Sequence, residues 1–133
     1  INSRTEGFGE EVKRRIMLGT FVLSAGYHEA YFTKAQKIRR LIKDKTNAMF
    51  EEYDFVISPT TPHTPFEIGM KQTDPTVMYL EDIFTVQANI AGVPAVSIPM
   101  GVHANGLPMG LQLMGRNGAD LDVLAMADWI QNH

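Results

Sequence analysis

The stretch from Asn89 to Gly115 constrains the fold more than any other part of the sequence. It holds two short apolar runs, Ala95–Met100 and Met109–Met114, each bounded by Gly or Pro. Between the runs lies Asn105-Gly106, a dipeptide that readily supplies the positive φ of a tight turn. The pattern therefore predicts two strands joined by a reversal of the chain.

Each predicted strand has one bulky face and one face that is small or weakly polar. In the first run Val and Ile alternate with Ala and Ser, and in the second run Leu alternates with Gly and Gln. A face this small allows another group to lie close to the strand. Prolines are expected only at the strand margins, where a missing N–H costs no ladder bond. They are Pro94, Pro99 and Pro108.

The remaining patterns predict an α/β fold in which helices cover a mixed sheet. Periodic apolar residues predict helices over residues 8–24, 27–52, 76–91 and 119–131, and a β-rich run over 54–59 precedes a Pro-rich loop. The helix over 76–91 is apolar on nearly every side, which is typical of a buried helix.

Periodicity also predicts which side chains of two helices face inward. In the helix over 27–52 the inner side is expected to carry Tyr31, Ala35, Ile38, Ile42 and Phe50. In the last helix we expect the inward side chains to be Leu121, Leu124, Ala125 and either Trp129 or Ala127.

Composition excludes several classes of protein. The 133 residues suffice for one domain, and the net charge of −3 argues against a nucleic-acid grip built by this chain alone. With no cysteine, disulfides and thiolate metal sites are excluded, and no apolar run reaches the roughly 18 residues of a membrane span. The cations between Lys34 and Lys45 are most simply a solvated helix face, with RNA or partner docking as the alternative.

Two ionic residues stand out. Arg15 borders the apolar stripe of the first helix, where an arginine commonly extends to water or meets a carboxylate. Asp82 falls within the predicted buried helix, where an acid needs a partner or hydrogen-bond donors. The residues alone favour structural roles for both. The four histidines lack metal-site spacing, and neither Ser58 nor Ser97 has the Gly-x-Ser-x-Gly pattern of a hydrolase nucleophile.

Nearly the whole chain, from about Phe8 onward, resembles the amidase-signature family, and within it the glutamine-hydrolysing subunits of tRNA-dependent amidotransferases. Ala-Gly-x-Pro and Gly-Leu-Pro-x-Gly-x-Gln are shared across the family, whereas Lys-Arg-Arg-Ile, Lys-Ala-Gln-Lys and Met-Tyr-x-x-Asp point to those subunits. The stretches that carry the resemblance are FGEEVKRRIMLGTFVLSAGYHEAYFTKAQKIRRLI, YDFVISPTTPHTPF, DPTVMYLEDIFTVQANIAGVPAVSIPMG and NGLPMGLQLMG.

The resemblance implies that residues 1–133 form the C-terminal part of a single amidase-signature domain with an α/β/α fold. Residues 1–7 are expected to be a flexible leader, and a chain that begins with Ile1 is interpreted as a piece of a longer protein. The Ser-Ser-Lys catalytic residues of the family are expected upstream. No catalytic residue, metal or cofactor is therefore expected in this segment, which would not hydrolyse glutamine by itself.

In such subunits the resemblance implies that ammonia released from glutamine passes to a partner subunit, which uses ATP and Mg to amidate Glu-tRNA(Gln). The implied partners are glutamine, subunits B and C of the complex, and the tRNA, which is contacted mainly through the partner subunit. The expected location is the bacterial cytoplasm, with no membrane association. The second arginine of Lys-Arg-Arg and the acid of Met-Tyr-x-x-Asp correspond to Arg15 and Asp82. The resemblance assigns them to the α-carboxylate and α-ammonium of glutamine.

Two other hypotheses remain open from the sequence. The first is another amidase-signature amidohydrolase that acts on a different amide with the same fold. The second is a non-enzymatic module in which the basic helix binds RNA or a protein partner. A panel of acylamide substrates distinguishes the first from a glutaminase, and a salt titration of tRNA binding tests the second.

Overall fold

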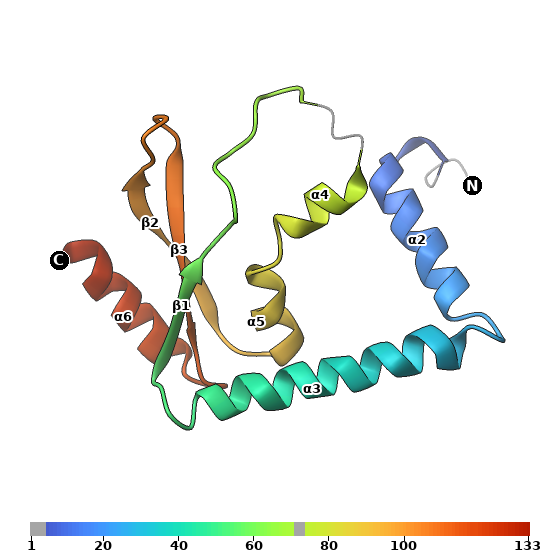
Figure 1. Cartoon of the computed structure of the whole chain (residues 1–133), viewed down its shortest axis with the longest axis horizontal. Helices are drawn as coiled ribbons and strands as arrows, with labels where there is room; N and C mark the ends of the chain where they lie inside the picture. Colours follow the sequence, from blue (N-terminus) through green and yellow to red (C-terminus); the bar gives the residue numbers. More distant parts are fainter. Residues whose placement is uncertain (1–4, 71–73) are drawn as a thin grey trace. The chain divides into compact units, whose positions relative to one another are not determined.

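The computed structural model describes residues 5–70 and 74–133, which form two compact units, Ile1–Arg40 and Leu41–His133 (Figure 1). The expected leader over residues 1–7 lies partly outside the described residues, and the single domain stays a prediction. The helical segments are α2 (Glu10–Val22), the π-helical η1 (His28–Thr33), α3 (Lys34–Met49), α4 (Pro75–Leu80), α5 (Thr85–Ala91) and α6 (Asp120–Asn132). The strands are β1 (Phe55–Pro59), β2 (Ala95–Val102) and β3 (Pro108–Gly115).

The first unit is built from α2, η1 and the beginning of α3. Aromatic rings join α2 to η1, since the ring centroid of Phe21 lies 4.3 Å from that of Tyr27 and 6.2 Å from that of Tyr31. The helix over residues 8–24 is confirmed, but its apolar stripe is not buried. Val12 and Ile16 are each 46% exposed.

The strands of the second unit form an antiparallel sheet in the order β1-β3-β2, which confirms the predicted hairpin. At its turn the Gly106 N–H donates to the His103 carbonyl at 2.9 Å, and the His103 N–H donates to the Leu107 carbonyl at 2.8 Å. Gly106 adopts φ = 83°, whereas no described residue other than glycine has a positive φ. The geometry is therefore a turn that ends in one left-handed glycine.

Pro99 lies inside β2, so the prediction that all three prolines lie at strand margins is wrong for this residue. Pro99 pairs with Gly110, and the register shifts between Pro99 and Val102. Gly101, within the shift, has φ = 100°. The ladder is already interrupted at this bulge, which is why a residue without an N–H is tolerated there.

Helices cover both faces of this sheet, which makes the second unit an α/β/α arrangement. Figure 1 shows α5 and α6 on opposite sides of the strands. On the α6 side Ile98 and Leu113 pack with Val123 and Ala127. On the α5 side the core consists of Ala88, Ala91, Val93 and Met114, with Phe50 and Val56 packed against it. The α/β class is confirmed, and the described strands pair only antiparallel.

The inward face of α6 differs from the prediction. Val123 and Ala127 are buried, whereas Leu121 and Trp129 are 80% and 58% exposed. Of the two alternatives, Ala127 is therefore confirmed. The sequence of α6 is apolar over more than one stripe, so helical periodicity alone does not select the stripe that contacts the sheet.

The predicted helix over residues 76–91 is interrupted. It consists of α4 and α5, joined by a turn at Glu81–Phe84 in which the N–H groups of Asp82 and Ile83 donate to carbonyls three residues earlier. Within this chain Ala88 and Ala91 are the buried residues of α5, and burial of the whole segment in a larger body stays a prediction. None of the helices described over residues 5–70 and 74–133 has the length and apolarity needed to cross a bilayer.

Candidate functional site

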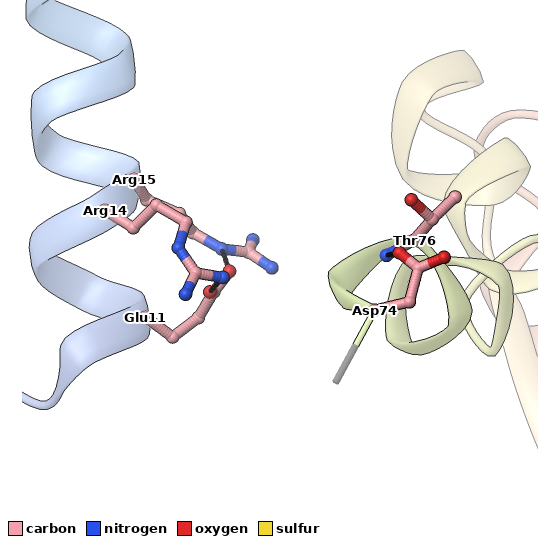
Figure 2. A network of polar contacts seen from close by, with 5 residues as sticks. All are labelled: Glu11, Arg14, Arg15, Asp74 and Thr76. Atoms are coloured by element: carbon pink, nitrogen blue, oxygen red, sulfur yellow. Dashed lines mark hydrogen bonds and ion pairs between the residues drawn. The ribbon is translucent and has the colours of Figure 1, made fainter. Parts of the chain in front are cut away.

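Arg15 lies on α2 and forms an ion pair with Glu11, one helical turn earlier. Its Nε donates to Glu11 Oε1 at 2.9 Å, and Arg14 Nη1 donates to Glu11 Oε2 at 3.0 Å (Figure 2). A single carboxylate thus orients two neighbouring guanidinium groups. The Arg15 side chain is 65% exposed in this chain, and its place beside a buried stripe stays a prediction for the complete protein.

Asp82 lies in the turn between α4 and α5, which corrects the prediction that it lies within a helix, and its side chain is exposed in this chain. Its backbone carbonyl accepts from the N–H groups of Thr85 and Val86 at 3.1 and 2.9 Å, which makes it the start of α5. The Thr85 hydroxyl donates to the same oxygen at 3.1 Å. Within residues 5–70 and 74–133 the Asp82 carboxylate makes no hydrogen bond or ion pair. It is therefore available to a cation.

Arg15 and Asp82 belong to different units, and their convergence on one substrate stays a prediction. Each lies where an ionic group can serve as a ligand contact. Arg15 presents a planar fork suited to a carboxylate, and Asp82 presents an anion suited to an ammonium group.

The turn that carries Asp82 is held from both ends by side chains, and one of them, Gln112, is the last residue of the Gly-Leu-Pro-x-Gly-x-Gln motif. Glu81 Oε1 lies 2.8 Å from His63 Nδ1, in the loop after β1. On the other side of Asp82, Gln112 Nε2 donates to the Phe84 carbonyl at 2.9 Å. No sequence spacing connects these residues, because the pairs are separated by 18 and 28 positions.

A cavity of about 420 Å³ opens beside this turn, between the loop after β1 and the hairpin. In its wall the hydroxyl oxygens of Thr60 and Ser97 lie 2.7 Å apart. A Cβ added to Gly110 would lie 2.8 Å from Thr60 Oγ1 and 3.0 Å from Ser97 Oγ. This confirms the prediction that the small face of the hairpin allows close approach. The cavity is also lined by His63, Glu81, Pro99 and Met109.

The helix before the turn begins with a capping carboxylate. Asp74 Oδ1 accepts a hydrogen bond from the Thr76 N–H at 2.8 Å, the contact that Figure 2 shows at the start of α4. The hydrogen bonds from the Thr76 backbone, and secondarily from its side chain, lower the pKa of the Asp74 carboxyl. The acid therefore stays ionised at the N-terminus of α4, where the helix dipole favours a negative charge.

Over residues 41–70 and 74–133 the side chains of the second unit supply binding groups and no nucleophile–base pair. The Ser58 hydroxyl accepts from Gln112 Nε2 at 3.2 Å, and the Ser97 hydroxyl pairs with Thr60. Among the described residues neither serine is hydrogen-bonded to a His or Lys, and no cluster of three or more His, Asp or Glu is arranged to hold a metal ion. The arrangement can bind and orient a charged ligand.

Comparison with known proteins gives a consistent result. Residues 1–124 match the Amidase family. The chain is 56% identical, over 95% of its length, to the A subunit of glutamyl-tRNA(Gln) amidotransferase from Halothermothrix orenii, of which it covers 26%. The crystal structure of the A subunit of the Thermotoga maritima enzyme superposes with a TM-score of 0.76 at 50% identity, covering 99% of this chain and 29% of that one.

A relative with a different substrate also has the same fold. The structure of 6-aminohexanoate cyclic dimer hydrolase matches with a TM-score of 0.68 at 27% identity, covering 77% of this chain and 24% of the hydrolase. The chain thus spans about a quarter of the length of the relatives it matches.

Proposed function

This chain belongs to the amidase family, and we propose that it forms the C-terminal portion of the glutamine-hydrolysing subunit of an amidotransferase. The observation that carries the proposal is an identity above one half, across nearly the whole chain, to the A subunit of glutamyl-tRNA(Gln) amidotransferase. Because the chain covers about a quarter of that relative, the activity belongs to the complete protein. The chain's own contribution is to bind the substrate.

In this proposal Arg15 binds the α-carboxylate of glutamine and Asp82 binds its α-ammonium. A guanidinium forms two parallel charge-assisted hydrogen bonds with a carboxylate, and its ion pair with Glu11 keeps the Arg15 side chain oriented along α2. With both ends of the amino acid fixed, the side-chain amide is directed at a serine nucleophile elsewhere in the complete protein. This is catalysis by positioning.

The released ammonia is proposed to travel to a partner subunit, where ATP and Mg support amidation of Glu-tRNA(Gln). Subunits B and C are the proposed protein partners, and the tRNA is held mainly by the partner subunit in the cytoplasm. The similarity to the Halothermothrix orenii protein, which is named for a glutamyl-tRNA(Gln) amidotransferase, supports this assignment. ATP and Mg are assigned to the partner, and no residue of this chain is assigned to them.

The experiment replaces Arg15 by Lys and Asp82 by Asn in the complete protein. We expect each substitution to lower kcat/KM for glutamine about ten- to a hundredfold, since Lys lacks the two-bond fork of Arg15 and Asn lacks the negative charge of Asp82. Arg14→Lys is the matched control, because Arg14 pairs with the same Glu11 carboxylate and has no proposed substrate contact. Near-parental glutamine kinetics in both test variants would reject the assigned roles.

The second candidate is an amidohydrolase for another amide, favoured by the match to 6-aminohexanoate cyclic dimer hydrolase. Such an enzyme need not recognise a free α-carboxylate and α-ammonium. Assaying the complete protein on glutamine and on a panel of acylamides separates the two. Hydrolysis of acylamides in preference to glutamine would select this candidate.

A further inference from the structure

Asp82 lies between two tertiary contacts that come from different directions in the second unit. On one side, Oε1 of the preceding residue Glu81 lies 2.8 Å from His63 Nδ1. On the other side, the carbonyl of Phe84 accepts a hydrogen bond from Gln112 Nε2 at 2.9 Å. Within the turn itself, the hydrogen bonds of Asp82 and Ile83 to preceding carbonyls measure 3.3 and 3.2 Å. These bonds are at or just beyond the long end of the usual range, and the Asp82 carbonyl accepts from the Val86 N–H at 2.9 Å as α5 begins. The two tertiary contacts therefore hold the turn and α5 against the rest of the second unit.

We propose that the His63–Glu81 contact is a positioning contact, which holds the Asp82 turn in the place where it receives the ammonium group of the substrate. The inference rests on the proposed function of Asp82. His63 and Glu81 touch no substrate in this scheme. Glu81 precedes Asp82 in the chain, and His63 holds Glu81 in place, so both act on Asp82 through the backbone of the turn.

The loop that carries His63 is suited to this role because it is itself tied to the sheet and the hairpin. The Thr60 N–H donates to the Gly110 carbonyl at 3.0 Å, and the Thr61 hydroxyl donates to the His63 carbonyl at 2.8 Å. Asn105 Nδ2 donates to the Thr64 hydroxyl at 3.2 Å. Prolines at 62 and 65 fix φ on either side of His63, which lowers the freedom of the loop. A rigid loop can hold a turn in place.

The burial of the two partners sets the expected size of the effect. The Glu81 side chain is 21% exposed and the His63 side chain 72% exposed. A partly exposed ion pair or charge-assisted hydrogen bond changes an equilibrium constant by up to about fivefold. A loosened turn lowers the fraction of the protein that is competent to bind glutamine, whereas glutamine once bound is still oriented by Arg15 and Asp82. The loss therefore appears mainly in KM.

The test uses the complete protein with His63→Ala, His63→Asn, Glu81→Gln and the double variant His63→Ala/Glu81→Gln. We expect His63→Ala to raise KM for glutamine about two- to fivefold at nearly constant kcat. Asn places a donor close to the position of Nδ1, so His63→Asn should keep KM near the parental value. In the double variant the increase should be less than the product of the two single effects. The matched control is His103→Ala, since His103 bonds within the hairpin turn.

Hydrogen exchange of the backbone amides over residues 79–87 supplies a readout that does not depend on glutamine. His63→Ala should accelerate exchange there and His63→Asn should restore it, with an unchanged thermal unfolding midpoint. Unchanged exchange in His63→Ala, or faster exchange with unchanged KM, would overturn the inference. A parent protein that fails to use glutamine, or an Asp82→Asn variant with normal kinetics, would instead reject the proposed function. In that case, the hydrogen exchange of the turn alone would show whether the His63–Glu81 contact holds the turn in place.

Discussion

The Gln112 side chain donates one hydrogen bond to the Phe84 carbonyl at 2.9 Å and another to the Ser58 hydroxyl at 3.2 Å. Through these contacts a buried residue of the central strand joins β1 to the turn that precedes α5. Gln112 is 4% exposed, so water does not replace these partners readily. The position of Asp82 therefore depends on a polar group in the middle of the sheet.

Replacing Gln112 by Leu should destabilise the complete protein by about 1–3 kcal/mol. Leu has a similar volume but leaves the Phe84 carbonyl and the Ser58 hydroxyl without this donor in a partly buried place. The thermal unfolding midpoint measures the effect. Gln131→Leu is the matched control, because Gln131 is exposed at the end of α6 and should change stability by less than about 0.5 kcal/mol. Equal midpoints for the two variants would contradict the role of the buried amide.

Replacing Gly115 by Ala should destabilise the contact between β3 and α6 by about 1–3 kcal/mol. A Cβ at Gly115 would collide with Val123 Cγ2, and Val123 is 2% exposed and restricted at χ1 as a β-branched residue. Trimming the obstacle with Val123→Ala should make the two substitutions less costly together than their sum. Chemical denaturation of both single variants and the double variant gives this coupling. Strict additivity would show that the close approach is not limiting.

The cap of α4 should weaken in acid. Hydrogen bonds from Thr76 lower the pKa of Asp74 in the folded chain relative to the unfolded chain. The stabilisation is therefore complete above the unfolded pKa and is lost as pH falls through the folded pKa. Following the Asp74 carboxyl by NMR during an acid titration should show a midpoint below that of an ordinary aspartate. Asp74→Asn, which keeps an acceptor without the titrating charge, should remove this pH dependence from α4, and a midpoint at or above the ordinary value would contradict the cap.

Several elements could be predicted because local chemistry decides them. The hairpin follows from two alternating apolar runs around Asn105-Gly106, and the close approach to its small face follows from the glycine at 110. The helix boundaries of α2 and α6 agree with the predicted ranges to within about two residues at each end. The periodicity of side chains and the φ preference of glycine act over a few residues, so these elements can be predicted from neighbouring residues in the sequence.

Other features depend on contacts between distant residues. Thr46 is 1% exposed on α3 and accepts from Gln87 at 3.2 Å. Helical periodicity instead predicts that Tyr31 and Ile38 face inward. In the structure they are 52% and 48% exposed. The spacing of Thr46 from Ile42 is compatible with the apolar face, but a hydroxyl side chain gives no signal of burial.

Local patterns in the chain establish the α/β class and the hairpin and single out Arg15 and Asp82, and the family resemblance adds the expectation that these two residues bind the substrate. Packing between distant segments establishes that the apolar segment over residues 76–91 breaks at Asp82, that α6 faces the sheet with Val123 and Ala127, and that His63 and Gln112 hold the broken turn. The reason is physical: propensity and periodicity are local, whereas a turn held by side chains 18 and 28 residues away depends on which surfaces the folded chain brings together.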